Sequence, residues 1–139
     1  MSGGTRKAKK EADILLIVHG ALMRDLLAKL LKERGHRVLT CAVGSDGIAR
    51  FVKKKKQFDL VLCDVSLPRM SGFCVAKRIK EMSQTTTIIL VKGIEDELNI
   101  GEFKESGADL VISGPLCVDE AIDLMERAIE SGTNCNRGA

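Results

Sequence analysis

One aspartate in the sequence, Asp64, stands where a carboxylate could take part in chemistry. It directly follows the short apolar run at residues 60–63, which is typical of a buried strand. In open parallel sheets, ligands bind outside the carboxyl ends of the strands, so an aspartate at this point is placed to meet one. Taken alone, the same residue could equally cap the turn that follows.

The other predicted strand ends carry different chemical groups. His19 and Gly20 follow the first apolar run, Lys92 follows the fourth, and Gly114 with Pro115 follows the fifth. Neither common glycine-rich phosphate loop occurs at these positions, which argues against nucleotide binding by those routes. Asp64 is therefore the one carboxylate that the pattern places for chemistry.

These residues are positioned by apolar runs that alternate with amphipathic segments. We expect strands at residues 14–18, 38–43, 60–63, 87–91 and 110–112, and helices at residues 22–34, 48–54, 73–82, 95–106 and 118–131. The first helix is indicated by leucines that recur at three- and four-residue spacing: Leu22, Leu26, Leu27, Leu30 and Leu31. Such alternation predicts an α/β fold, a doubly wound (βα)5 domain whose five-stranded parallel sheet has helices on both faces.

Length and composition indicate one globular domain. The chain has 139 residues, of which 45% are hydrophobic, enough to bury a core without disulfides. We expect this domain at residues 13–131, between a flexible basic N-terminal segment at 1–12 and a disordered tail at 132–139. The basic run at 53–56 is expected to be a solvated helix end, with an acidic partner or nucleic acid as the alternative.

Composition also limits the location and the partners. The five cysteines are scattered and no secretory signal precedes them, which favours a cytoplasmic location. The apolar runs are too short to span a membrane. There is no Trp or Tyr, so the aromatic platforms typical of single-strand nucleic-acid binding are missing. We expect neither membrane nor nucleic acid as a partner of this chain.

The surroundings of Asp64 resemble the central signature of response-regulator receiver domains. The resemblance rests on residues 59–72, DLVLCDVSLPRMSG, above all the Leu-Pro-x-Met-x-Gly stretch, and on the Gly-Ala-Asp at 107–109 with Pro115 after it. It covers residues 13–131. It implies a flavodoxin-like receiver fold with Asp64 at the phospho-acceptor position, in a non-enzymatic protein of phosphorelay signal transduction.

The sequence departs from this family at the positions that would hold a metal ion. Receivers resemble one another in an acidic pair after the first strand, where this chain has His19 and Gly20. In the family that pair holds a divalent ion together with the acceptor and a backbone carbonyl, here that of Ser66. Mg²⁺ usually needs one or two carboxylates besides phosphate and water. Asp64 with the Ser66 carbonyl therefore predicts weak Mg²⁺ binding at best.

Two further positions depart from the family's pattern. Lys92 stands where the family has a hydroxyl, and Gly114 stands where it has a lysine, although Pro115 is retained. Attack of a carboxylate on a phosphoryl group brings anionic oxygens together, so the reaction needs nearby cations. Lys92 is a candidate charge partner of Asp64. It could form a standing ion pair, stabilise an incoming phosphate, or extend into water.

Three functions follow as hypotheses. The first is a divergent receiver, or pseudo-receiver, with degenerate metal and switch sites, which acts as a protein-interaction module for a sensor histidine kinase, a phosphotransferase or a downstream signalling protein. The second is a functional aspartyl-phosphate switch that a histidine kinase modifies. The third and most distant is a flavodoxin-like cofactor-binding protein. It would need a phosphate-cradling loop after the first strand and aromatic walls, and the sequence offers neither.

Overall fold

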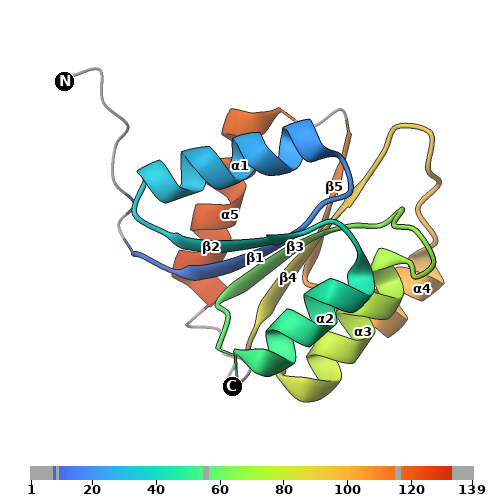
Figure 1. The fold of residues 1–139 in the computed structure, drawn as a ribbon. Helices are drawn as coiled ribbons and strands as arrows, with labels where there is room; N and C mark the ends of the chain where they lie inside the picture. Colours follow the sequence, from blue (N-terminus) through green and yellow to red (C-terminus); the bar gives the residue numbers. More distant parts are fainter. Residues whose placement is uncertain (1–7, 9, 55–56, 115–116, 133–139) are drawn as a thin grey trace.

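The computed structural model describes residues 8, 10–54, 57–114 and 117–132 (Figure 1). Pro115, most of the predicted N-terminal segment and the predicted tail beyond residue 132 lie outside the described residues. In chain order the elements are β1 (Asp13–Ile17), α1 (Ala21–Glu33), β2 (Arg37–Cys41), α2 (Gly44–Lys53), β3 (Leu60–Asp64), α3 (Gly72–Met82), β4 (Thr87–Lys92), α4 (Ile100–Ser106), β5 (Leu110–Ser113) and α5 (Val118–Gly132).

The strands form one parallel sheet in the order β2-β1-β3-β4-β5. The chain first moves from β1 to β2 and then returns past β1 to β3, so the winding direction changes between β1 and β3. In open α/β sheets such a switch point leaves a crevice at the carboxyl ends of the two strands. The prediction of a doubly wound five-stranded parallel sheet is confirmed.

Two separate cores lie on the two faces of this sheet. Helices α1 and α5 cover one face, and α2, α3 and α4 cover the other (Figure 1). Leu16 of β1 packs with Leu27 of α1 and Met125 of α5 in the first core. Its neighbour Leu15 packs with Phe51 of α2 in the second, because successive strand residues point to opposite faces. The interior strands are thus fixed from both sides.

The buried face of α1 is narrower than its leucine spacing predicts. Leu27 and Leu31 are fully buried, whereas Leu22 is 85% exposed and Leu26 is 39% exposed. Residues four apart lie above one another on a helix, so Leu22 and Leu26 form one row and Leu27 and Leu31 form another. The second row faces the sheet and Leu30 packs beside it, so the leucine spacing predicts the helix but not which leucines are buried.

Helix α2 begins earlier than the glycine-rich segment before it predicts. The helix expected from residue 48 begins at Gly44. A Cβ atom at Gly44 would lie 2.7 Å from Val75 Cγ2, and one at Gly47 would lie 2.4 Å from Ile17 Cδ1. These glycines therefore allow close packing of α2 on the sheet and on α3.

Helix α4 begins later than predicted, at Ile100 in place of residue 95. The side chain of Asn99 accepts a hydrogen bond from the amide of Glu102 at 2.9 Å and so caps the first turn. The residues before Asn99 form an irregular loop between β4 and α4. None of the helices in the described part of the chain is both long and apolar enough to cross a lipid bilayer.

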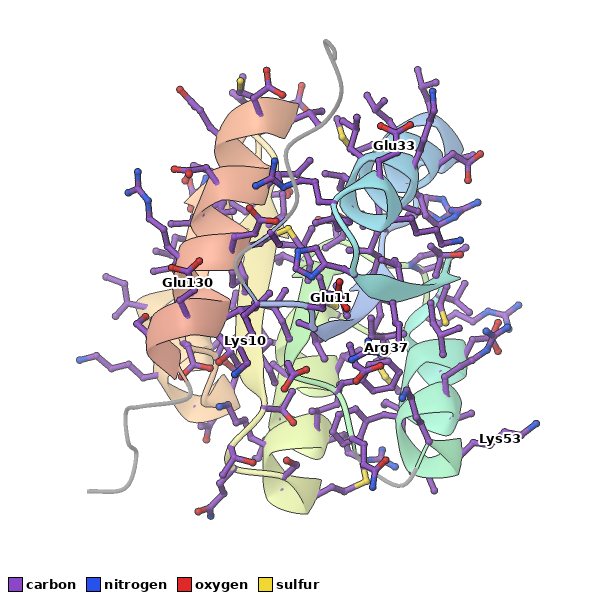
Figure 2. All side chains as sticks on the ribbon, turned by 90° about the vertical axis from the view of Figure 1, so that its left-hand side faces the viewer. Lys10, Glu11, Glu33, Arg37, Lys53 and Glu130 are labelled. Carbon is purple, nitrogen blue, oxygen red and sulfur yellow. The ribbon has the colours of Figure 1, made fainter. Side chains whose placement is uncertain are left out.

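Charged residues surround the amino-terminal end of β1. Asp13 pairs with Arg37 Nε at 2.9 Å and with Lys54 Nζ at 3.2 Å, and Lys54 Nζ lies 5.3 Å from the centroid of the Phe58 ring. Lys53 points away from the fold (Figure 2). The described part of the basic run thus combines a solvated side chain with one that pairs with Asp13, at the end of the strand opposite to the crevice. Residues 55 and 56 lie outside the described residues.

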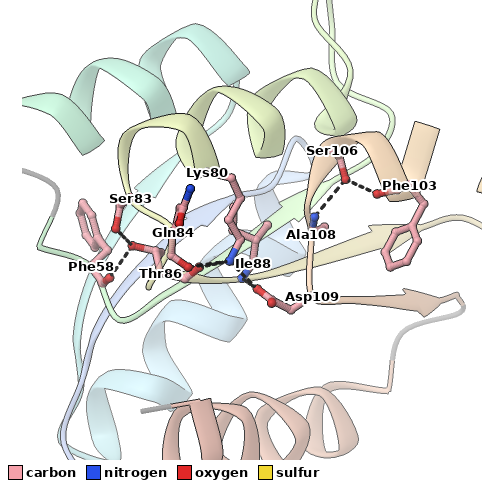
Figure 3. A network of polar contacts seen from close by, with 10 residues as sticks. All are labelled: Phe58, Lys80, Ser83, Gln84, Thr86, Ile88, Phe103, Ser106, Ala108 and Asp109. Carbon is pink, nitrogen blue, oxygen red and sulfur yellow. Dashed lines mark hydrogen bonds and ion pairs between the residues drawn. The ribbon is translucent and has the colours of Figure 1, made fainter. Parts of the chain in front are cut away.

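A polar network joins α3 to the starts of β4 and β5 (Figure 3). Lys80 Nζ donates to the Thr86 carbonyl at 2.7 Å and pairs with Asp109 Oδ2 at 2.9 Å. Asp109 Oδ2 also accepts from the amide of Ile88 at 2.8 Å, and Thr86 Oγ1 donates to the Phe58 carbonyl at 3.1 Å. This network fixes the loops at the end of the sheet away from Asp64.

A largely buried ionic cluster joins α5 to the turn after α1. Glu126 accepts hydrogen bonds from Arg34 Nε at 2.7 Å and from His36 Nε2 at 2.8 Å. His36 Nδ1 accepts the amide hydrogen of Ala12, so Nε2 carries the ring proton. Burial alone would raise the pKa of Glu126, but the hydrogen bonds from Arg34 and His36 outweigh burial and hold its pKa below the usual range.

We expect Glu126→Gln to lower the free energy of unfolding by about 1–2 kcal/mol at neutral pH. A lowered folded-state pKa contributes stability above the unfolded-state pKa, and this is lost as the pH falls through the folded-state value. The difference from wild type should therefore shrink below about pH 4. Denaturant melts at several pH values measure it, with Asp123→Asn, which breaks an exposed pair with Arg127, as the control. A difference that stays constant with pH would contradict this account.

Candidate functional site

The site is built at the switch point between β1 and β3. Asp64 ends β3, and its Oδ2 accepts a hydrogen bond from the amide of His19, just after β1, at 2.9 Å. On the other side, Asp64 pairs in register with Val91 of β4. The predicted position of Asp64 at the carboxyl edge of the sheet is confirmed by this geometry.

The start of α3 packs directly against the backbone of Asp64. The amide of Gly72 donates to the Val65 carbonyl at 2.8 Å, and a Cβ atom at position 72 would lie 2.2 Å from the backbone oxygen of Asp64. No side chain fits in that distance. The glycine that ends the Leu-Pro-x-Met-x-Gly stretch is therefore a packing requirement of the site.

The carboxylate of Asp64 is short of compensating charge. Burial raises its pKa most, the His19 amide opposes that rise, and the negative charge of Asp96 adds to it. The neighbouring thiol of Cys63 is fully buried, and burial raises its pKa as well. The site thus contains one half-buried carboxylate that favours protonation more than an ordinary aspartate does.

The backbone of the loop after β1 is bound by an arginine that the sequence patterns did not single out. Arg24 of α1 donates through Nη1 to the carbonyls of Val18 at 2.8 Å and His19 at 3.1 Å. His19 and Gly20 are both exposed, and a Cβ atom at Gly20 would meet nothing within 4 Å. These two positions, which lack the acidic pair, therefore have room for larger side chains.

Lys92 follows the residue that pairs with Asp64, but its ammonium is used elsewhere in this structure. Its Nζ donates to the carbonyl of Asp96 at 2.7 Å and to that of Gly93 at 3.3 Å. No ion pair joins Lys92 to Asp64 within 4.0 Å in this part of the described chain. This arrangement therefore does not contain the standing ion pair with Asp64, and a role of Lys92 as charge partner stays a prediction that requires its side chain to move.

Asp96 is a second carboxylate at the site, and sequence analysis missed it. A hollow of about 530 Å³ beside Asp64 is lined by Ser66, Lys92, Gly93, Asp96 and Gly114. Asp96 Oδ2 accepts hydrogen bonds from the Gly93 amide at 2.9 Å and from Ser66 Oγ at 3.1 Å. Because Asp96 belongs to an irregular loop, no periodicity in the sequence could have marked it.

Gly114 occupies the position where the family has a lysine, and its backbone packs closely against the end of β4. The amide of Gly114 donates to the Lys92 carbonyl at 2.7 Å. A Cβ atom at Gly114 would lie 3.3 Å from that carbonyl oxygen and 3.6 Å from the Cα atom of Gly93. The strand ends of β4 and β5 are thus closer together than a side chain at 114 would allow without small shifts.

The loop between β3 and α3 contains a strained residue. Arg69 has a φ of 69°, and the amide of Met70 donates to the carbonyl of Pro68 at 2.8 Å, which together form a tight γ-turn. Such backbone conformations are uncommon outside glycine and cluster at functional loops. The sequence carries no glycine at this position that would have revealed the turn.

The residues at the site do not fit a bound Mg²⁺ ion. Within the described ranges, no three His, Cys, Asp or Glu side chains are grouped closely enough to hold a metal. Asp96 already accepts two hydrogen bonds from the protein, and the acidic pair is replaced by His19 and Gly20. Asp64 is then left with the Ser66 carbonyl, which is a sparse set of oxygen ligands for an octahedral Mg²⁺ site.

The fold and this strand-end aspartate define a class of protein, the doubly wound α/β signalling domains with an aspartate at the β1/β3 switch point. The sequence profile of the response regulator receiver domain matches residues 14–126. The chain therefore belongs to the receiver domain family of two-component response regulators. Receiver domains are signalling modules that interact with histidine kinases and phosphotransferases.

Curated relatives agree with this assignment. The chain is 36% identical over 103 residues to the transcriptional regulatory protein AfsQ1 of Streptomyces coelicolor, covering 74% of this chain and 44% of that protein. It is 32% identical over 119 residues to the sensor histidine kinase RcsC of Escherichia coli, covering 83% of this chain and 12% of the kinase. The chain thus spans less than half of these relatives. It is 26% identical to the two-component response regulator ARR22 of Arabidopsis thaliana, covering 94% and 96% of the two chains.

Solved structures share the fold. A CheY-like receiver domain protein from Methanospirillum hungatei superposes with a TM-score of 0.81 at 20% identity, covering 91% of this chain and all of the other. The BeF3-activated receiver domain of DrrB has a TM-score of 0.74 at 25% identity, covering 87% and 99% of the two chains. The prediction of a flavodoxin-like receiver fold is confirmed.

We expect Gly72→Ala to destabilise the protein by about 2 kcal/mol or more, because its Cβ atom would overlap the backbone of Asp64. Alanine favours helices over glycine, so a loss of stability would come from this contact. Gly20→Ala is the matched control, with open space around its Cβ atom and an expected change within about 0.5 kcal/mol. Denaturant melts compare the two. Equal effects would contradict the packing argument.

We expect Asp64→Asn to raise the melting temperature by roughly 2 °C or more at pH 7, because it removes a partly buried charge and keeps an acceptor for the His19 amide. A raised folded-state pKa means that the charged form opposes folding above that pKa. The gain should therefore fade at acidic pH, where Asp64 itself becomes neutral. Asp25→Asn, at an exposed position of α1, is the control, and a pH-independent gain would argue for another cause.

Proposed function

We propose that this receiver domain acts as a protein-interaction module in two-component signalling, with little or no phosphorylation of Asp64. The partner would be a sensor histidine kinase, a phosphotransferase or a downstream signalling protein. The observation that carries this proposal is the direction of the Lys92 ammonium, which is bound by two loop carbonyls. The acceptor carboxylate therefore has no cation directed at it from this side.

The chemistry of phosphoryl transfer supports the same reading. When a carboxylate oxygen bonds to phosphorus and the donor's oxygen or nitrogen leaves, charge gathers on the phosphoryl oxygens and must be neutralised. The amide of His19 donates one hydrogen bond to Asp64, and Asp96 adds negative charge beside it. The charge of Asp96 opposes the approach of an anionic phosphoryl donor, and a single amide offsets little of it.

The alternative function is a working aspartyl-phosphate switch. One observation favours it, since the Asp64 carboxylate lines a hollow of about 530 Å³ and is reachable from outside. A reorientation of Lys92 away from the loop could then supply the missing cation. The two functions differ in a direct chemical property, the reactivity of Asp64 towards a phosphoryl donor.

We expect the intact mass of the wild-type chain to stay unchanged after incubation with a small-molecule phosphoryl donor, with or without Mg²⁺. The combined variant His19→Asp/Gly20→Asp/Lys92→Thr, which rebuilds the acidic pair and the hydroxyl, should form at least about ten times more adduct with Mg²⁺. Room at Gly20 makes the acidic replacement feasible.

Asp64→Asn in the rebuilt variant controls for modification at other residues, and a conventional receiver controls for the donor. A metal-dependent adduct on wild-type Asp64 would overturn the proposal in favour of the switch. A rebuilt variant that binds Mg²⁺ no better by titration would show that the loop geometry has diverged along with the charges.

A further inference from the structure

The loop between β4 and α4, residues 93–99, is fastened to the loop after β3 by a side chain. Asp96 Oδ2 accepts hydrogen bonds from the Gly93 amide at 2.9 Å and from Ser66 Oγ at 3.1 Å. The first bond closes a turn within the β4–α4 loop. The second joins that turn to the residue two positions after Asp64.

The same turn is held by a cation on its other side. Lys92 Nζ donates to the Asp96 carbonyl at 2.7 Å and to the Gly93 carbonyl at 3.3 Å, and the Asp96 amide donates to the Gly93 carbonyl at 3.2 Å. Hydrogen bonds to charged groups are stronger than neutral ones. The Asp96 carboxylate and the Lys92 ammonium therefore both bind the four-residue turn at residues 93–96.

We propose that Ser66, Lys92 and Asp96 form a latch that holds the β4–α4 loop against the β3–α3 loop in the unmodified protein. The latch uses groups of the chain alone. It goes beyond the proposed function, since it concerns what fixes the loop and holds whether or not Asp64 can be phosphorylated.

The latch determines two properties of the site. It keeps the Lys92 ammonium on the loop, so an ion pair with Asp64 would have to compete with two carbonyl contacts for the same side chain. It also fixes a loop that exposes two large apolar side chains, Ile94 at 68% and Leu98 at 37%. The positions of these side chains on the surface thus depend on polar contacts beside Asp64.

Amide hydrogen exchange on the full chain, followed by NMR, tests the latch. Ser66→Ala removes only the hydroxyl that joins the two loops and deletes no partner of a loop amide. We expect the amides of Gly93 and Asp96 to exchange roughly threefold to tenfold faster in this variant. The Asp59 amide, which donates to the Asp13 carbonyl at the opposite end of the sheet, serves as an internal reference that should not change.

Further variants at Lys92 and Asp96 separate charge from geometry. Lys92→Met keeps most of the length of the side chain without its ammonium and should speed exchange at the same two amides. Asp96→Asn keeps an acceptor oxygen and should retain most of the protection that Asp96→Ala loses. Glu95→Gln, at an exposed neighbour outside the latch, is the matched control.

Unchanged exchange in both Ser66→Ala and Lys92→Met would overturn the latch, because the loop would then be held by its own turn. Equal acceleration by Glu95→Gln would overturn it too, since the effect would reflect general electrostatics. Neither result depends on whether Asp64 forms a phosphoryl adduct, so the latch and the proposed function can fail separately.

Discussion

The balance of charge around Asp64 is the constraint on which the functional end of this molecule depends. A doubly wound sheet places that carboxylate at the β1/β3 switch point, where it is partly desolvated whatever else surrounds it. Desolvation raises the pKa of Asp64. The hydrogen bond from the His19 amide opposes this rise, and the negative charge of Asp96 adds to it. An ionised Asp64 is therefore already at a disadvantage before any anionic group approaches.

The cation at the end of the neighbouring strand β4 contributes to conformation more than to chemistry. Lys92 leaves β4 one residue after the partner of Asp64, but its ammonium binds the carbonyls of Gly93 and Asp96. A cation used in this way cannot at the same time neutralise charge on Asp64. The Lys92 ammonium thus binds the β4–α4 loop, and the negative charge of Asp64 is left without this cation as a partner.

The sequence was sufficient for the sheet and for the position of Asp64, because strands buried on both faces leave continuous apolar runs. It was misleading at Gly44 and Gly47, which resemble turn residues but serve close helix packing. It was silent about Asp96, which belongs to an irregular loop. The direction of Lys92 follows from a competition between acceptors in space, and no spacing of residues along a chain encodes that outcome.

The separation between the cores and the site explains how a receiver fold can accommodate replacements at its strand ends. The buried residues of both cores lie mostly on the strands and helices, whereas His19 and Gly20 are exposed and the space beside Gly20 is open. Replacement of the acidic pair there removes no packing. Gly72 is different, because its contact with the Asp64 backbone is both structural and part of the family's signature. The fold itself therefore explains why Gly72 is present, and this glycine is weaker support for phosphoryl transfer than for a preserved fold.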